Sequence, residues 1–522
     1  MTTLADILLK GAERFGPREA VADPGGTVTY AELAAGAGRL ARALRATGAR
    51  PGDRSAVVLP NSIAFVRAHF ANLLAGLVSV PCDASVTAES FAALAAQACP
   101  RILLTDEAGL KRLAAAAPIA AAIEKIFVID GAGPWSDPRV GSAAAALAAE
   151  PDGVFCEQRA PGDLAALMYT TGATGGPKGV MLTHENVLAA LRSIVEFVRY
   201  TPDDREVVIL PLSHNFGLGH VYCNLMSGGA VYTENGLVRV GRVLKALESF
   251  RATGFPGTPM GFGMLLDQYG PVLASKGAKL RFCVVNSAPL PPERTAQLQT
   301  LLPRLDIMVY YGLTEASRSA FISLTRSGPD HYRAVGKPLP HVELEIRGSS
   351  GGRAPAGETG EVVVRGPAVA RGYWADEAQT AAAFPDGWLH TGDLGHLDAS
   401  GCLWITGRLK DLINVGGYKV HPGEVEKVVG TFPAVHDTGA VGLEGLGGLT
   451  GEAIVAAVVL RPGHGFDEAG LERFCLERLE KFKVPARFVA VAEIPRSDTG
   501  KVKRADLARL VAVQLAAGPA KN

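Results

Sequence analysis

The chain has 522 residues, of which 48% are hydrophobic and 20% are charged, so it has the composition of a globular protein and is too long for one compact core. Lysine and arginine together number 52, as do aspartate and glutamate, and this balance provides no basic field to attract nucleic acid or anionic lipid. The seven cysteines include no Cys-x-x-Cys pair, which argues against a zinc framework or a disulfide scaffold. With no secretory signal and no bilayer-spanning apolar run, we expect a cytoplasmic protein.

Helical and strand-like stretches alternate over the first 165 residues. A helical pattern at 31–47 is followed by an apolar strand at 55–59, and a helix at 65–77 is followed by a strand at 78–81. This alternation predicts a parallel α/β sheet. The pattern continues with strand candidates at 207–211 and 280–285 and a helix at 243–250.

A segment rich in glycine and threonine follows the apolar run 164–168. Its sequence is Tyr169-Thr-Thr-Gly-Ala-Thr-Gly-Gly-Pro-Lys-Gly179. The glycines allow a tight backbone with exposed N–H groups, the threonines supply hydroxyls and Lys178 supplies a cation, a combination suited to polyphosphate. It is not a Walker loop, because Gly179 stands where that motif needs Ser or Thr. A flexible surface turn is the alternative interpretation.

The pattern changes from about residue 335. Short strands at 342–346, 360–365 and 403–405 are separated by glycine-containing turns, which predicts a small β subdomain over about 335–405. Strands and helices then resume. We therefore expect an N-terminal domain over 1–408 and a C-terminal α+β domain over 409–522.

Three later clusters carry groups suited to a nucleotide. Tyr310-Tyr-Gly-Leu-Thr-Glu315 combines an aromatic ring for a base, a hydroxyl for a phosphate oxygen and a carboxylate for Mg²⁺. Asp393 can accept both hydroxyls of a ribose, although alone it is more typical of a turn. Lys501 lies on a glycine-containing loop in a basic run, which alone indicates a solvated face.

Together these clusters resemble the adenylate-forming superfamily, which includes acyl-CoA synthetases, adenylation domains of peptide synthetases and firefly luciferase. The resemblance covers nearly the whole chain, from Thr29 to Lys501. It rests on the glycine–threonine segment and, in the family's order, on Tyr311-Gly-Leu-Thr-Glu315, Thr391-Gly-Asp393, Gly407-Arg408 and Gly500-Lys501. It implies a large N-terminal domain of parallel-rich α/β sheets with a small β subdomain, and a small, mobile α+β C-terminal domain. Within the loop, Ala173 departs from the family's more usual Thr, and one hydroxyl donor is missing there.

The resemblance implies a role for each matching residue. ATP would be held by Thr171, Thr174, Gly175 and Lys178 at the phosphates, by Ser287, Ala288, Pro289, Tyr311 and Gly312 at the adenine, by Thr314 at the α-phosphate, and by Asp393 and Arg408 at the ribose. The catalytic set would be Lys501, Glu315, His214 and Thr171, with Glu315 binding Mg²⁺. Lys410 would be the hinge, and Gly416 and Gly417 would face the incoming thiol.

The acid is defined less sharply. The implied acyl pocket consists of His214, Asn215, Phe216, Gly257, Thr258 and Gly312. The pair Asn215–Phe216 resembles aryl-acid-activating enzymes, while the glycine-containing wall leaves room for a chain or a ring, so fatty and aromatic acids both stay open. A buried structural histidine is the alternative for His214.

Three interpretations of function remain open. The favoured one is an acyl-CoA synthetase, which converts a small carboxylic acid and ATP, with Mg²⁺, to acyl-AMP and pyrophosphate and then transfers the acyl group to coenzyme A. The second is a stand-alone adenylation enzyme that loads the phosphopantetheine of a separate carrier protein. The third, a catalytically silent nucleotide-binding relative, is disfavoured because Glu315, Asp393, Arg408 and Lys501 are all present.

Overall fold

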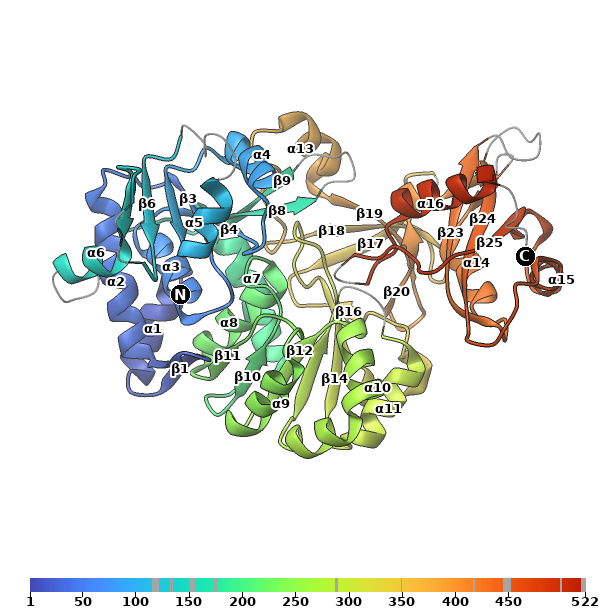
Figure 1. Cartoon of the computed structure of the whole chain (residues 1–522), viewed down its shortest axis with the longest axis horizontal. Helices are drawn as coiled ribbons and strands as arrows, with labels where there is room; N and C mark the ends of the chain where they lie inside the picture. The colour runs from blue at the N-terminus through green and yellow to red at the C-terminus, as the bar shows by residue number, and fades with distance from the viewer. Residues whose placement is uncertain are drawn as a thin grey trace.

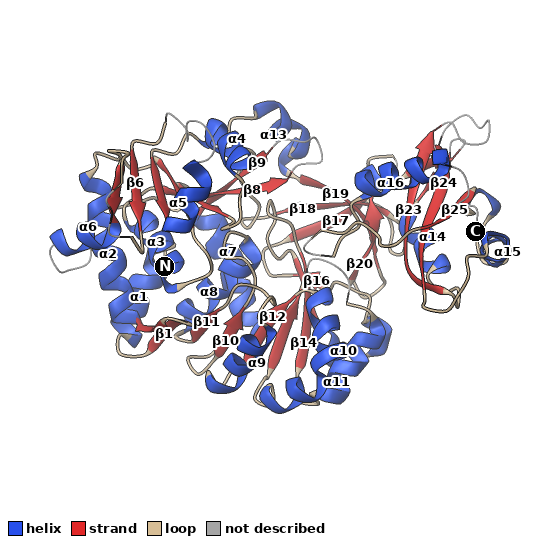
Figure 2. Cartoon of the chain, viewed as in Figure 1, coloured by secondary structure: helices blue, strands red, loops and turns tan. Residues whose placement is uncertain are grey.

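A computed structural model describes residues 1–114, 122–131, 133, 135–150, 155–171, 177–286, 290–348, 350–415, 418–444, 452–497 and 500–517. Two mostly parallel sheets form the large N-terminal part (Figure 1), and helices pack against them (Figure 2). A four-stranded antiparallel sheet follows, and the C-terminal elements form a separate group beside it (Figure 1). Among the described residues, no helix has the length and apolarity needed to cross a bilayer.

The first large sheet has seven strands in the order β7-β6-β5-β3-β4-β8-β9. All neighbours are parallel except β8 and β9, which are antiparallel at one edge. Strands such as β5 are buried along their whole length, as expected for a parallel sheet covered on both faces. Their bounds are β3 (Arg54–Val58), β4 (Val78–Cys82), β5 (Ile102–Thr105), β6 (Lys125–Val128), β7 (Val140–Ser142), β8 (Leu164–Thr171) and β9 (Pro177–Thr183).

The second large sheet has nine strands in the order β16-β15-β14-β13-β12-β10-β11-β1-β2. Its central strands are parallel, and β2, β15 and β16 join by antiparallel pairing. The bounds are β1 (Glu19–Asp23), β2 (Gly26–Thr29), β10 (Arg205–Val208), β11 (Ala230–Thr233), β12 (Gly254–Gly257), β13 (Phe282–Val285), β14 (Asp306–Tyr311), β15 (Ala320–Ser323) and β16 (Lys337–Pro338).

Helices of the N-terminal part begin at polar caps in several places. The Thr183 hydroxyl accepts from the N–H of Asn186, so α7 starts directly after β9, and the Thr258 hydroxyl caps α10 in the same way. The helices are α1 (Ala5–Phe15), α2 (Tyr30–Ala46), α3 (Ile63–Leu74), α4 (Ala88–Ala98), α5 (Glu107–Ala114), α6 (Ala143–Ala149), α7 (His184–Val198), α8 (Asn215–Ser227), α9 (Val240–Ser249), α10 (Pro259–Lys276), α11 (Pro292–Leu301), α12 (Leu324–Ser327) and α13 (Glu377–Ala383).

The four-stranded sheet consists of β17 (Glu343–Arg347), β18 (Gly360–Arg365), β19 (Leu389–Leu397) and β20 (Leu403–Arg408). The C-terminal elements are β21 (Ile413–Val415), β22 (Tyr418–Val420), α14 (Pro422–Val429), β23 (Val435–Glu444), β24 (Glu452–Leu460), α15 (Glu468–Leu476), β25 (Arg487–Ala490) and α16 (Arg504–Ala517). Short 3₁₀ turns lie at η1 (Pro329–His331), η2 (Pro385–Gly387), η3 (Leu409–Asp411) and η4 (Lys481–Lys483). Two apolar clusters belong to the C-terminal elements alone, so this small α+β domain has its own core.

The α/β class predicted from the sequence is confirmed, and the differences are local. The helix predicted over 65–77 ends at Leu74, because Gly76 has a left-handed backbone with φ 73°. The strand predicted over 207–211 ends at Val208, ahead of Pro211, which has no N–H for the ladder. Strand β16 pairs with β15, so the four-stranded sheet begins at Glu343 rather than near 335.

Candidate active site

The glycine–threonine segment connects two antiparallel strands. Thr170 is paired with Lys178 and Thr171 with Pro177 across the β8–β9 hairpin. Residues 172–176, which include Thr174 and Gly175, lie outside the described part of the chain, as does the side chain of Thr171. The segment therefore leads from strand to strand, and the helix α7 begins only after β9.

Lys178 and Glu315 are both in contact with one tyrosine. The Lys178 ammonium lies 5.7 Å from the ring centroid of Tyr373, within cation–π range. The Tyr373 hydroxyl donates to Glu315 Oε1 at 2.7 Å. Burial and the neighbouring Glu315 carboxylate raise the pKa of Tyr373, which keeps its hydroxyl protonated as a donor. Tyr373 was not among the residues predicted from the sequence.

A tight turn after β14 presents Thr314 and Glu315. The N–H of Leu313 donates to the carbonyl of Ala316 at 3.0 Å, which closes the turn. A Cβ at Gly312 would lie 2.4 Å from the backbone nitrogen of Arg318, so only glycine fits there. The carbonyl of Thr314 accepts a 3.4 Å hydrogen bond from the Asn215 side-chain amide.

Asp393 links the aromatic side chain at the end of β14 to the last residue of β20. Its Oδ2 accepts from the Tyr311 hydroxyl at 2.8 Å, and its Oδ1 lies 2.8 Å from Arg408 Nε. Asp393 and Arg408 are also cross-strand partners in the β19–β20 ladder. Asp393 is only 5% exposed, and burial together with its negative charge raises the pKa of Tyr311 well above the usual range. The three side chains form one polar cluster.

Lys501 belongs to the C-terminal domain and yet lies beside this cluster. The protein around it desolvates the ammonium, and the charge of Arg408 adds to this effect, so the pKa of Lys501 is lowered although the residue is exposed. Asp393 acts in the opposite direction. The same loop reaches the start of α10, where a Cβ on Gly500 would lie 3.7 Å from the Met260 Cβ. In this orientation the loop that carries Lys501 lies against the N-terminal part of the chain.

Three of the residues predicted to line the acyl pocket, His214, Asn215 and Phe216, lie at the start of α8. His214 is exposed at the N-terminal end of α8, so the alternative of a buried structural histidine is wrong. The Phe216 ring packs edge-on against Tyr310 at 5.4 Å. At the end of β12, Gly257 is buried against Phe262, and Thr258 caps α10.

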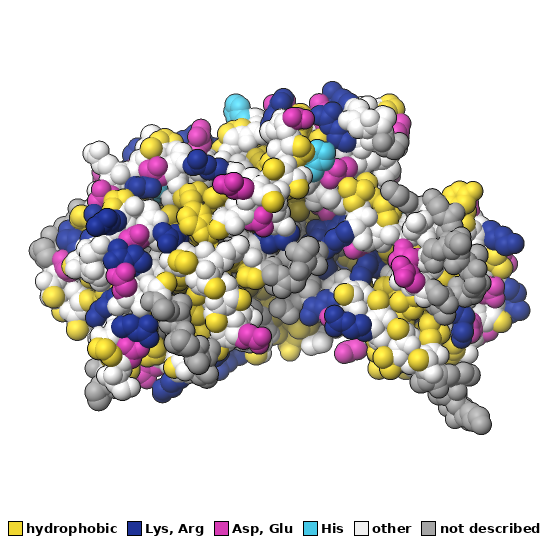
Figure 3. All heavy atoms as spheres, turned by 90° about the horizontal axis from the view of Figure 1, so that it is seen from above, with side chains coloured by type: hydrophobic (Ala, Val, Ile, Leu, Met, Phe, Trp, Pro, Cys, Tyr) yellow, Lys and Arg dark blue, Asp and Glu magenta, His cyan; other side chains and the backbone are white. Residues whose placement is uncertain are grey.

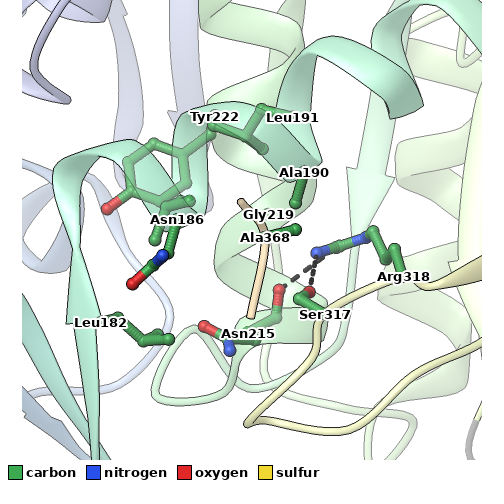
Figure 4. A pocket seen from close by; sticks show the side chains of 11 residues that line it. Leu182, Asn186, Ala190, Leu191, Asn215, Gly219, Tyr222, Ser317, Arg318 and Ala368 are labelled. Atoms are coloured by element: carbon green, nitrogen blue, oxygen red, sulfur yellow. Dashed lines mark hydrogen bonds between the residues drawn. The ribbon is translucent and has the colours of Figure 1, made fainter. Parts of the chain in front are cut away.

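A small pocket, partly open to solvent, lies between α7, α8 and the turn after β14. Of the predicted acyl-pocket residues, Asn215 lines it (Figure 4). Arg318, which the sequence prediction missed, also lines it and is 3% exposed. The guanidinium of Arg318 donates to the carbonyl oxygens of Asn215 and Phe216 at 3.1 and 3.2 Å (Figure 4 draws the Asn215 contact). A Cβ at Gly219 would lie 2.2 Å from the guanidinium, so this glycine makes room for it.

The remaining predicted residues divide into two groups. Lys410 is exposed in the 3₁₀ turn η3, directly after β20. Ser287, Ala288, Pro289, Gly416 and Gly417 lie outside the described residues. Seen from above, the surface is hollowed between the N-terminal part and the C-terminal domain, and Lys and Arg side chains gather there (Figure 3). A cleft with basic groups on both sides is suited to an anionic nucleotide.

The chain matches known protein families over most of its length. The AMP-binding enzyme family matches residues 8–374, and the AMP-binding enzyme C-terminal domain matches residues 424–501. The chain is 31% identical over 514 residues to an oxalate–CoA ligase of Arabidopsis thaliana, covering 96% of this chain and 97% of that protein. It is also 31% identical over 498 residues to a feruloyl-CoA synthase of an Amycolatopsis species, covering 95% and 96%. ATP-bound MatB from Rhodopseudomonas palustris superposes with a TM-score of 0.87 at 29% identity, covering 98% and 99% of the two chains.

The chain therefore belongs to the AMP-binding enzymes of the adenylate-forming superfamily. Within that superfamily it is an AMP-forming acid–thiol ligase of the acyl-CoA synthetase family, as predicted from the sequence.

Proposed function

We propose that this enzyme converts a carboxylic acid and ATP to acyl-AMP and pyrophosphate in the cleft above β14 and β19, and then passes the acyl group to the thiol of coenzyme A. The observation that carries this assignment is the gathering of Lys501, Arg408 and Asp393 beside Tyr311, at the end of the strand that leads to Glu315. These groups come from three separate segments of the chain.

The nucleotide would be held by the predicted residues. Lys178, with Thr171, Thr174 and Gly175, would hold the phosphates, Thr314 the α-phosphate, Tyr311 and Gly312 with Ser287, Ala288 and Pro289 the adenine, and Asp393 and Arg408 the ribose. Both oxygens of Asp393 already have a partner in the protein. An ionised carboxylate offers about four acceptor sites, so it can still accept from ribose hydroxyls.

Glu315 suits Mg²⁺. Among the described residues there is no cluster of three or more His, Cys, Asp or Glu side chains arranged for a metal ion. A single carboxylate is the kind of site that Mg²⁺ uses when substrate phosphates and water supply its other ligands. Tyr373 occupies Oε1 of Glu315, and no described residue hydrogen-bonds to Oε2. Bound there, Mg²⁺ would offset negative charge on the phosphates.

Cationic groups of the protein would accelerate the first reaction. A carboxylate that attacks the α-phosphate brings two anions together, and negative charge grows on the oxygens around phosphorus. Cations fixed beforehand stabilise that charge more in the transition state than in the ground state. Lys501 would provide this cation between the acid and the α-phosphate, and His214 would lie beside the acid or the thiol path.

The second reaction requires a different arrangement of the same chain. We place the domain boundary at Arg408, with residues 1–408 forming the N-terminal domain, including its β subdomain, and 409–522 the mobile C-terminal domain. Rotation at Lys410 would remove Lys501 and bring Gly416 and Gly417 to the thiol. Lys410 is exposed in a single 3₁₀ turn, which supports a hinge there.

The acid is proposed as a chemical class. The two related ligases named above act, by their names, on oxalate and on ferulate. We propose a fatty or aromatic acid for this enzyme, with His214, Asn215, Phe216, Gly257, Thr258 and Gly312 around it. Coenzyme A is the proposed acceptor, with the phosphopantetheine of a separate carrier protein as the alternative.

The test is pyrophosphate release from ATP with a panel of fatty, aromatic and dicarboxylic acids, each with and without coenzyme A. AMP and acyl-CoA formed only when coenzyme A is present support the proposed function. Acyl-adenylate that accumulates and ignores coenzyme A identifies the carrier-loading alternative. Failure of every acid to release pyrophosphate contradicts an adenylating role.

A further inference from the structure

The segment 370–374 is hydrogen-bonded on one side to the strand that leaves the phosphate loop. The N–H of Met181 donates to the carbonyl of Gly372 at 2.9 Å, the N–H of Arg371 to that of Met181 at 3.0 Å, and the N–H of Trp374 to that of Gly179 at 2.7 Å. These bonds place Tyr373 opposite Val180 as an antiparallel pair. The segment therefore extends the seven-stranded sheet beyond β9.

The start of the same segment is bonded to the turn that carries Glu315. The N–H of Ala370 donates to the Glu315 carbonyl at 2.7 Å, and Val369 forms an antiparallel bridge with Ala316. Five residues thus connect the backbone of β9 with the backbone of the metal-site turn.

The side chain of Tyr373 repeats this connection. It is 9% exposed, its hydroxyl bonds to Glu315 Oε1, and its ring lies under the Lys178 ammonium. The backbone N–H of Tyr373 donates to the Thr380 hydroxyl at 2.9 Å, and Phe384 packs against the ring at 5.9 Å. These contacts hold the ring in one orientation, so the hydroxyl is aimed at a fixed point.

We propose that Tyr373 is a positioning residue that fixes Glu315 relative to Lys178. The metal held by Glu315 and the ATP phosphates held by Lys178 would then bind next to each other. This inference rests on the proposed roles of Glu315 and Lys178. The phenol binds Oε1 of Glu315 and leaves Oε2 for the metal, and this hydrogen bond limits rotation of the carboxylate. Without the hydroxyl, Glu315 would have to be ordered by the metal itself, which lowers metal affinity.

The variant that tests this is Tyr373→Phe, which removes the hydroxyl and keeps the ring against Lys178 and Phe384. Tyr332→Phe is the matched control, because Tyr332 is equally buried and its hydroxyl bonds to Gln299 Oε1 at 2.6 Å, away from the site. Thermal unfolding checks that both variants keep the fold. Mn²⁺ serves as the probe, titrated by electron paramagnetic resonance into the complex with α,β-methylene-ATP, so that the measurement needs neither turnover nor knowledge of the acid.

We expect Tyr373→Phe to weaken Mn²⁺ binding by about tenfold, the size typical of one hydrogen bond to a charged group. Tyr332→Phe should leave it unchanged. Glu315→Gln should weaken it at least as much, and adding Tyr373→Phe to Glu315→Gln should change little more, because the hydroxyl acts through that carboxylate. Pyrophosphate release by Tyr373→Phe should recover as Mg²⁺ is raised.

Three results would overturn the inference. The first is a Mn²⁺ affinity of Tyr373→Phe within twofold of that of the wild type. The second is a double variant in which the effects of Tyr373→Phe and Glu315→Gln on the Mn²⁺ affinity add in full. The third is a Glu315→Gln variant with unchanged Mn²⁺ affinity. A wild type that binds Mn²⁺ and nucleotide but releases no pyrophosphate with any acid would contradict the proposed function. The Mn²⁺ titrations would still test the positioning role of Tyr373, because they need no turnover.

Discussion

Arg408 donates from Nε to Oδ1 of Asp393 across 2.8 Å, and the two residues are cross-strand partners at the end of the β19–β20 ladder. The last residue of the four-stranded sheet is thereby fixed to a buried carboxylate of the proposed nucleotide site. Arg408 also lowers the pKa of Lys501, so the pair lies close to a cation of the proposed C-terminal domain.

Replacing Asp393 by Asn should weaken ATP binding and stability together. The substitution removes the charge that pairs with Arg408 and an acceptor for ribose. We expect at least about a tenfold rise in KM for ATP and a loss of about 1–3 kcal/mol in the free energy of unfolding. Steady-state kinetics and denaturant unfolding check this. Asp267→Asn is the control, because Asp267 pairs with Arg294 at 2.8 Å on a half-exposed surface. An unchanged KM for ATP in Asp393→Asn would contradict the proposed role of Asp393 in binding the ribose.

Lys501→Ala should separate the two half-reactions. Loss of a cation at the developing charge typically costs about 10²–10³ in rate, so acid-dependent pyrophosphate release should fall by that factor. Transfer to coenzyme A from preformed acyl-adenylate should be largely spared. Lys503→Ala, two residues along the same exposed segment, should affect neither step. Equal losses in both half-reactions would contradict the role of Lys501.

Lys410→Pro should slow thioester formation more than adenylation. Proline fixes φ near −65° and so restricts the turn about which the domains would rotate. Single-turnover rates for each half-reaction measure the difference. Lys410→Ala removes the same side chain with no backbone restriction and should slow neither step comparably. A proline variant slowed equally in both steps would argue against a hinge at this residue.

Gly407→Ala should have the opposite effect. A Cβ at Gly407 would lie 2.3 Å from Nδ1 of His421, which packs there from beyond the proposed hinge. The methyl group therefore disfavours the orientation that brings Lys501 to the cleft, and adenylation should slow by about tenfold or more, with thioester formation much less affected. Gly423→Ala is the control, since its nearest neighbour, the Thr406 carbonyl, lies at 3.8 Å. Unaltered adenylation in Gly407→Ala would show that the contact does not select the orientation.

His184 should make the fold sensitive to acid. It is 2% exposed, its Nδ1 accepts from the N–H of Leu4, and burial lowers its pKa from 6.5 to about 4. The unfolded chain binds the proton more tightly, so this stability is present above pH 6.5 and is lost as the pH falls toward 4. The loss amounts to about 3 kcal/mol.

The comparison is between the wild type and His184→Asn, whose side chain can accept the same bond but does not titrate. Chemical denaturation at pH 7 and pH 4 should show a fall in unfolding free energy that is smaller in the variant by about 3 kcal/mol. Other buried histidines titrate in both proteins and cancel in the difference. Identical falls would show that His184 does not carry this dependence.

Local patterns and motif order predicted much of this molecule. The alternation of helices and apolar strands was enough to predict the α/β class. A buried parallel strand is a short apolar run, and this signal is local in the sequence because it does not depend on which strands pair with it. Motif order also indicated that Asp393, Arg408 and Lys501 belong together. Tyr373 could not be found in this way, because its contact with Glu315 joins residues 58 positions apart through sheet pairing. The Gly-Tyr-Trp sequence around it is unremarkable as a local signal.

Arg318 shows a second reason for a missed residue. A charged side chain in a run of small polar residues indicates exposure, because arginine is rarely buried. Here the guanidinium enters a notch that Gly219 leaves in α8 and bonds to the backbone of the helix. The notch exists only once α8 and the turn after β14 have packed, so neither local sequence predicts it.

The backbone attachment of residues 371–374 to β9 also affects how the molecule meets others. Strand β9 ends the seven-stranded sheet, and an outermost strand with free N–H and C=O groups invites pairing with another chain. Met181 and Gly179 already use these groups within the molecule. The short stretch that supports Glu315, the proposed metal ligand, therefore also covers the outward-facing backbone of β9 and hinders its pairing with another chain.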